Sequence, residues 1–204
     1  MLDGLKRDWA EPLWNSLAKP LAKAGLTPNQ ITLLGLVLVV LNCALFCWHK
    51  STFWLGLGLA VSFAFDALDG AVARLRNMSS KFGGYLDGVI DRYQEIVVFA
   101  SIAWVTGWWA LSFFALTGSL MVSYNKARAA IEIPIENHAW PDLLERFERV
   151  VILSLALLLD SFVTLPDVLG GRVLFLALLV LGALAHLTAI QRFFRARRML
   201  TPDD

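Results

Sequence analysis

The stretch DALDGAVARLRNMSSKFGGYLDGVIDR, Asp66 to Arg92, places four aspartates between two strongly apolar segments. The segment STFWLGLGLAVSFAF precedes it and YQEIVVFASIAWVTGWW follows it, and both have the composition of helices that enter a bilayer. An aspartate at the centre of a membrane helix costs about 2.5–3.5 kcal/mol, and less near the interface. Four aspartates at the ends of two apolar segments therefore predict a functional site.

Outside this stretch the chain is also dominated by apolar residues. It has 204 residues, of which 57% are hydrophobic, and a mean hydropathy of +0.61. The apolar residues form six blocks of about 20, the length that a helix needs to cross about 30 Å of hydrocarbon. We predict an all-α integral membrane protein with six transmembrane helices, approximately at 30–48, 53–75, 82–105, 109–131, 148–165 and 172–193.

The first 24 residues differ from the rest, because they mix charged and apolar residues and lack the apolar core of a signal peptide. Their large apolar residues recur at three- or four-residue steps, which indicates an amphipathic helix on the membrane surface. A soluble cap on the bundle is the alternative. We expect a juxtamembrane helix over 1–24, ended by Gly25, and a six-helix domain over 25–204. Thr27 and Pro28 are expected to cap and begin the first span.

The basic residues are distributed unevenly between the predicted loops. Of the 18 Lys and Arg residues, only Lys50 and Arg172 lie near the first, third and fifth loops between spans. The positive-inside rule then places both termini, the even-numbered loops and the aspartates on the cytoplasmic side of the cell membrane. Tryptophans gather at the opposite ends of the spans, as in an aromatic belt: Trp48, Trp54, Trp104, Trp108 and Trp109.

The spacing of the aspartates favours a metal site. Asp66 and Asp69 are three residues apart and Asp87 and Asp91 four apart, so each pair shares a helix face. The two helices are expected to run antiparallel, so the pairs can face each other, and four converging carboxylates repel unless cations lie between them. Oxygen ligands without His or Cys favour Mg²⁺ or Mn²⁺, and two pairs suggest two ions. Interhelical salt bridges and a proton relay are the alternatives, although a relay needs acids spread across the membrane.

Glycines and one arginine lie between the aspartates. Gly70, Gly83 and Gly84 have no side chain, so a ligand or a backbone can approach them closely. Arg74 lies one helical turn beyond Gly70, where it can pair with an aspartate or with a phosphate. The stretch therefore has the components of a phosphate site as well as a metal site.

With these residues in place, the stretch resembles the signature of the CDP-alcohol phosphotransferases, D-x2-D-G-x2-A-R-x8-G-x3-D-x3-D. It matches at eight positions with every spacing kept: Asp66, Asp69, Gly70, Ala73, Arg74, Gly83, Asp87 and Asp91. The resemblance implies six spans, a surface N-terminal helix and a cytoplasmic site. It also implies a homodimer. We expect no nucleic-acid partner.

The resemblance further implies the reaction. Enzymes of this family displace CMP from a CDP-linked lipid, here CDP-diacylglycerol or CDP-archaeol, with an alcohol. By resemblance, Asp66, Asp69 and Asp87 hold one divalent ion, and Asp87 and Asp91 share a second. Asp91 is then also the base that deprotonates the incoming hydroxyl. The residues expected to contact the CDP-lipid are Asn29, Thr32, Gly70, Ala73, Arg74, Ser80 and Gly83.

A second cluster of residues bears on the acceptor alcohol. Basic residues at the predicted cytoplasmic ends of spans four to six could ring a pocket for a phosphorylated acceptor: Lys126, Arg128, Arg146, Arg149 and Arg192. Membrane anchoring is the alternative for such cations. The segments SYNKARA and ERFERV resemble the branch that transfers to inositol phosphate, the phosphatidylinositol- and archaetidylinositol-phosphate synthases, with Ala130 in place of a glutamate. Inositol 1-phosphate is thus the expected acceptor, and glycerol 3-phosphate, as in phosphatidylglycerophosphate synthases, is the alternative.

A divalent-cation transporter is a hypothesis from another functional class. Transporters place their ligands near the bilayer midplane on broken helices, with access from both sides. Here the aspartates gather at one end of the spans, which favours the enzyme.

Overall fold

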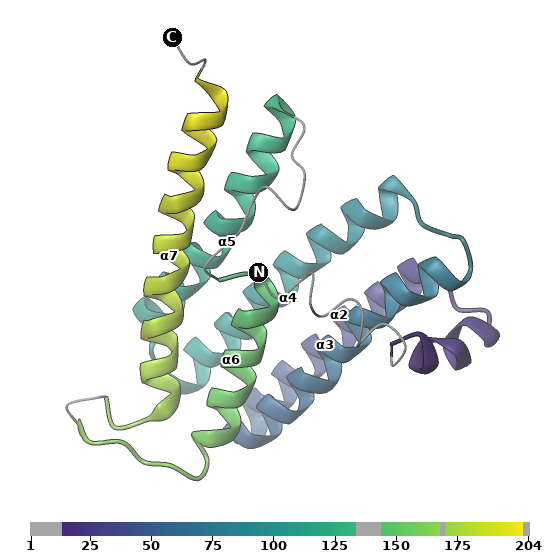
Figure 1. The fold of residues 1–204 in the computed structure, drawn as a ribbon. Coiled ribbons are helices and arrows are strands. Elements are labelled where there is room, and N and C mark those ends of the chain that lie inside the picture. Colours follow the sequence, from purple (N-terminus) through teal and green to yellow (C-terminus); the bar gives the residue numbers. More distant parts are fainter. Residues whose placement is uncertain (1–13, 134–143, 168–169, 202–204) are drawn as a thin grey trace. The chain divides into compact units, whose positions relative to one another are not determined.

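The computed structural model describes residues 14–133, 144–167 and 170–201, except for the side chains of residues 66 and 67. A helical segment over 14–23 precedes α2 (Pro28–His49), α3 (Thr52–Leu75), α4 (Lys81–Thr106), α5 (Trp109–Glu132), α6 (Arg146–Leu159) and α7 (Val173–Leu200) (Figure 1). The prediction of an all-α chain is confirmed. Among the described residues, α2, α3 and α7 are each long and apolar enough to cross a membrane.

Two predicted spans differ from the observed helices by more than two residues at one end. The sixth, 172–193, continues as α7 to Leu200, and the fifth, 148–165, ends early. Helix α6 ends at Leu159 rather than at residue 165, and its 14 residues extend about 21 Å, less than the thickness of the hydrocarbon core. The helix ends there because the chain turns after Asp160, whose carboxylate accepts a hydrogen bond from the side chain of Arg172. Thr164 and Arg172 then form an isolated β-bridge. The apolar run continues past the end of the helix, so it does not mark this boundary.

The chain divides into two compact units, Met1–Ser101 and Ile102–Asp204, with the division near the end of α4. In the first unit α2 packs against α3, and the Asn42 amide donates a hydrogen bond of 3.0 Å to the carbonyl of Leu55. The helical segment over 14–23 contributes Ala18 to a core with Ile31 and Leu68. It therefore packs against α2 and α3 along its apolar side, while its position on a membrane surface stays a prediction.

The entry to α2 is built as its local sequence predicts. Thr27 is the N-cap, its hydroxyl accepts a hydrogen bond from the Gln30 amide, and the Gln30 side chain accepts one from the Thr27 amide. Pro28 occupies the first helical position. This capping box satisfies amide groups that have no partner within the helix.

In the second unit α7 packs against both α5 and α6. Gly118 and Gly182 lie at the α5–α7 contact, and the ring of His186 stacks on Phe114 with 4.7 Å between ring centroids. The Asn125 amide donates to the carbonyl of Ala189 at 2.9 Å, again from α5 to α7. Small residues and polar side-chain contacts thus join these helices, as is usual where lipid weakens the hydrophobic driving force.

Candidate functional site

The first contact within the motif joins α2 to α3. Thr32 is buried on α2, and its hydroxyl donates a hydrogen bond of 2.5 Å to Oδ2 of Asp69 on α3. A hydroxyl bonded to a carboxylate at this distance is typical of a charge-assisted hydrogen bond. Thr32, which is expected to contact the CDP-lipid, thus donates a hydrogen bond to Asp69, which is an expected metal ligand.

A second contact brings the start of α2 to the start of α4. The Oγ of Ser80 accepts a hydrogen bond of 3.0 Å from the amide of Gly83, in the first turn of α4. A Cβ added to Gly83 would lie 3.1 Å from that Oγ and 3.3 Å from Oδ1 of Asn29. Asn29, Ser80 and Gly83 therefore lie together, and the lack of a side chain at Gly83 gives the two polar groups room.

The remaining motif residues on α3 lie near its end. A Cβ added to Gly70 would lie 3.6 Å from Nη1 of Arg74, so the guanidinium of Arg74 folds back over Gly70 as the one-turn spacing predicts. Arg74 is exposed and Ala73 is half-buried. The guanidinium and the bare glycine backbone thus share one surface of α3.

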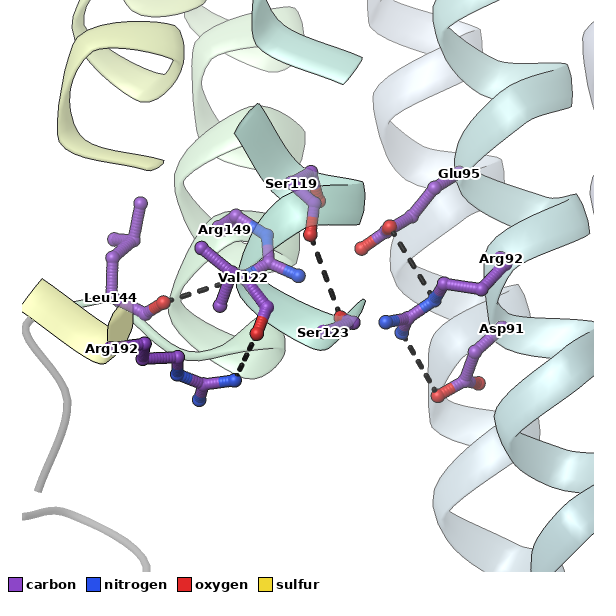
Figure 2. A network of polar contacts seen from close by, with 9 residues as sticks. All are labelled: Asp91, Arg92, Glu95, Ser119, Val122, Ser123, Leu144, Arg149 and Arg192. Carbon is purple, nitrogen blue, oxygen red and sulfur yellow. Dashed lines mark hydrogen bonds and ion pairs between the residues drawn. The ribbon is translucent and has the colours of Figure 1, made fainter. Parts of the chain in front are cut away.

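On α4, Asp87 is half-buried and Asp91 is buried. Arg92 lies between two carboxylates, with Nη2 at 3.5 Å from Oδ2 of Asp91 and Nε at 3.7 Å from Oε2 of Glu95 (Figure 2). Glu95 is only 6% exposed. Arg92 and Glu95 were missed by sequence reasoning, although two charged residues just past Asp91 in an apolar segment were a signal.

The expected metal site consists of carboxylates alone. Among the side chains that the structure describes, no three His, Cys, Asp or Glu residues form a group able to hold a metal ion, and Asp66 is outside that set. The described members Asp69, Asp87 and Asp91 supply oxygen donors, which suit Mg²⁺ or Mn²⁺ better than zinc. The chemistry of the donors fits such ions, and the two-ion arrangement stays a prediction.

Two of the five basic residues predicted for the acceptor are deeply buried. Arg149, in the first turn of α6, is 7% exposed and donates a hydrogen bond of 3.3 Å to the carbonyl of Leu144. Arg192, on α7, is 5% exposed and donates to the carbonyl of Val122 on α5 (Figure 2). A guanidinium has five N–H donors in a planar fork that matches a phosphate, so both buried arginines stay candidates for binding one.

The other three basic residues are less buried. Arg128 is half exposed and forms an ion pair of 2.6 Å with Glu132, one turn further along α5. Lys126 and Arg146 are half-buried. All five belong to Ile102–Asp204, whereas the aspartates belong to Met1–Ser101, so their meeting in one pocket stays a prediction.

Comparison with known proteins identifies the family. Residues 25–185 match the family described as CDP-alcohol phosphatidyltransferase. The chain is 33% identical over 202 residues to an archaetidylinositol phosphate synthase of Pyrococcus horikoshii, covering 98% of each chain. It is 34% identical over 155 residues to a phosphatidylinositol phosphate synthase of Mycobacteroides abscessus, covering 72% of this chain and 69% of the relative.

The fold is similar to that of the phosphatidylinositol phosphate synthase of Mycobacterium tuberculosis. The crystal structure of that enzyme with manganese and citrate has a TM-score of 0.79 at 26% identity, covering 94% of this chain and 93% of the other. Its structure with CDP-DAG bound has a TM-score of 0.80 at 24% identity, covering 95% and 99%. With its motif, its all-α membrane fold and these relatives, the chain belongs to the CDP-alcohol phosphatidyltransferase family and is a membrane transferase of phospholipid synthesis.

Proposed function

We propose that this enzyme transfers the phosphatidyl or archaetidyl group of a CDP-lipid to an inositol phosphate, most simply inositol 1-phosphate, and releases CMP. The observation that carries the acceptor is the burial of Arg149 and Arg192 in one unit. A guanidinium can donate two parallel hydrogen bonds to a phosphate, so buried arginines suit an acceptor alcohol that already carries a phosphate group. The named functions of the relatives from Pyrococcus horikoshii and Mycobacteroides abscessus support inositol phosphate in particular.

The reaction forms one P–O bond and breaks another. The acceptor hydroxyl attacks the phosphorus next to the lipid, the bond from that phosphorus to the CMP phosphate oxygen breaks, and CMP leaves with the electron pair. Asp91 would take the proton of the attacking hydroxyl as a general base. Arg92, between Asp91 and Glu95, would limit the motion of the Asp91 carboxylate.

The four motif aspartates would hold the divalent ions. Asp66, Asp69 and Asp87 would bind one ion, and Asp87 and Asp91 a second, with Mg²⁺ or Mn²⁺ as the ions. Bound ions of this kind neutralise phosphate charge and make a nearby hydroxyl easier to deprotonate. The manganese in the Mycobacterium tuberculosis structure supports a divalent ion. The hydrogen bond from Thr32 would orient the Asp69 carboxylate toward its ion.

The CDP-lipid would lie against the exposed ends of α2, α3 and α4. The motif residues Gly70, Ala73 and Arg74 would contact the nucleotide and its phosphates. Asn29, Thr32, Ser80 and Gly83 would line the rest of this site, supported by the proximity of Asn29 and Ser80 around Gly83. Both CDP-diacylglycerol and CDP-archaeol fit this description, because the contacts proposed for the motif residues are to the nucleotide and phosphates that the two lipids share.

We also propose that the chain crosses the cell membrane six times, with both termini and the site in the cytoplasm, and that it forms a homodimer. The concentration of Lys and Arg at one set of loops supports this orientation. Helix α6 then needs residues beyond Leu159 to complete its crossing. A cysteine introduced at Ser79 should react with an impermeant thiol reagent only from the cytoplasmic side, and one at Lys50 only from the outside.

An acceptor screen tests the proposed reaction. Purified enzyme with CDP-diacylglycerol or CDP-archaeol and Mg²⁺ or Mn²⁺ should release CMP with inositol 1-phosphate, and far less with serine or unphosphorylated inositol. Glycerol 3-phosphate is the matched alternative, because it also carries a phosphate. If glycerol 3-phosphate is the better acceptor, or unphosphorylated inositol is equally good, the proposed acceptor is wrong.

A further inference from the structure

Arg76 makes a contact that the motif does not explain. It follows the last residue of α3, and its Nη1 donates to the carbonyls of Gly25 at 2.8 Å and Leu26 at 2.6 Å. These carbonyls lie about 50 residues earlier in the chain. A single guanidinium nitrogen thus holds two consecutive carbonyls of a distant segment.

Those two carbonyls form the corner between the helical segment over 14–23 and α2. The amide of Gly25 bonds to the carbonyl of Ala22 at 3.2 Å, and the amide of Leu26 to the carbonyl of Leu21 at 3.3 Å. With Gly25 at φ +83°, this is the Schellman ending of a helix. The amides of Gly25 and Leu26 are therefore used within the corner, and Arg76 satisfies their carbonyls.

The corner leads directly into the candidate site. Thr27 caps α2 immediately after Leu26, and the first turns of α2 carry Asn29 and Thr32. Thr32 donates to Asp69, and Asn29 lies beside Gly83. Hydrogen bonds to α3 and its C-cap thus lie on both sides of the first turn of α2. Arg76 makes those before it, to the Gly25 and Leu26 carbonyls, and Thr32 makes the one after it, to Asp69.

We propose that Arg76 is a positioning residue of the transferase. By holding the Gly25 and Leu26 carbonyls, it sets the start of α2, so that Thr32 meets Asp69 and Asn29 faces the CDP-lipid. This inference rests on the proposed CDP-lipid site. A merely structural Arg76 would stabilise the N-terminal helical segment without acting through Thr32.

Kinetics of Arg76→Met, Arg76→Lys and the control Arg197→Met separate these roles. Arg197 is an exposed arginine in the last turn of α7. We expect Arg76→Met to raise the KM for the CDP-lipid about tenfold, with an unchanged KM for the acceptor. Arg76→Lys should recover most of this loss, because an ammonium can also donate to two carbonyls. Equal increases in both KM values, or no recovery by lysine, would overturn the proposal.

A double-mutant cycle with Thr32→Val tests whether Arg76 acts through Thr32. In the Thr32→Val background, Arg76→Met should change the KM for the CDP-lipid much less than in the wild type, because the positioned group is already gone. Full additivity of the two changes means that Arg76 acts elsewhere and rejects the positioning role.

Hydrogen–deuterium exchange provides a readout that does not depend on turnover. The amides of residues 25–32 should exchange faster in Arg76→Met than in the wild type, and should be unaffected by Arg197→Met. If exchange there is unchanged, the inference fails even when the enzyme is active. If the wild type releases no CMP with any acceptor, the proposed function fails, and the exchange experiment still decides whether Arg76 fixes the start of α2.

Discussion

Glycines serve opposite purposes in two regions of this molecule. In the motif region, a Cβ at Gly70 would meet only Arg74 at an ordinary contact distance of 3.6 Å, and one at Gly84 would meet nothing within 4 Å. At the α5–α7 contact, a Cβ at Gly118 would come within 2.9 Å of His186, and one at Gly182 within 3.3 Å of the Ala115 backbone. The packing of α5 on α7 requires the second pair of glycines, whereas the described protein leaves open space beside Gly70 and Gly84, where the CDP-lipid is proposed to bind.

Two buried carboxylates, Asp160 and Asp91, also differ between a structural role and a role proposed at the site. The side chain of Asp160 is fully buried at the start of the α6–α7 connection, where it accepts hydrogen bonds from Arg172 and, at 3.0 Å, from the amide of Leu174. The contact of Asp91 with Arg92 is longer, at 3.5 Å. The contacts of Asp160 join the two ends of one connection, which is typical of a structural carboxylate, whereas the role proposed for Asp91 is chemical.

The largest effect is expected for Asp91→Asn. Loss of a general base lowers turnover by about 10²- to 10⁴-fold. Binding of the CDP-lipid and the melting temperature should change little, because the amide has nearly the same shape. CMP release and CDP-lipid binding, measured on the same preparation, check this. Turnover like that of the wild type would contradict the assignment of Asp91 as the base.

Asp160→Asn is the matched change in the other region. It weakens the hydrogen bonds to Arg172, and we expect a loss of about 2 kcal/mol in the free energy of unfolding. Turnover per folded molecule should stay near that of the wild type. Denaturation in detergent alongside the CMP assay measures both quantities. If activity falls while stability is kept, the division between a structural and a chemical carboxylate is wrong.

Substitutions of the glycines sharpen the first contrast. Gly118→Val should lower stability by about 1–3 kcal/mol, because the added atoms collide with α7. Gly70→Ala should keep or slightly raise stability, since alanine favours the helix, but should raise the KM for the CDP-lipid. Thermal unfolding and substrate titrations of both variants test this. A Gly70→Ala enzyme with an unchanged KM would argue against a close ligand there.

The smallest effects are expected among the basic residues of the second unit. Arg149→Lys keeps the charge but loses the guanidinium fork, and should raise the KM for the phosphorylated acceptor about tenfold. Arg128→Lys should change this KM less than twofold, because Arg128 is half exposed and pairs with Glu132. Acceptor titrations at fixed CDP-lipid compare the two. Equal effects would mean that burial does not identify the acceptor residues.

Features that depend on a few neighbouring residues were predicted correctly from the sequence. Gly25 ends the N-terminal helix, and Thr27 and Pro28 begin α2, because capping involves only residues within one turn. The end of α6 was not predicted, because it depends on the bond between Asp160 and Arg172, across a loop and against an apolar sequence that continues. Arg92 and Glu95 were overlooked because the motif ends at Asp91.

Residue spacing was enough to identify the family, the approximate positions of the helices and the candidate aspartates, because spacing along a helix fixes which residues share a face. Which of these residues meet depended on the folded chain. The contacts of Thr32 with Asp69 and of Arg76 with Gly25 join segments about 40 to 50 residues apart. Such contacts depend on how helices pack, and no local pattern in the sequence specifies that packing.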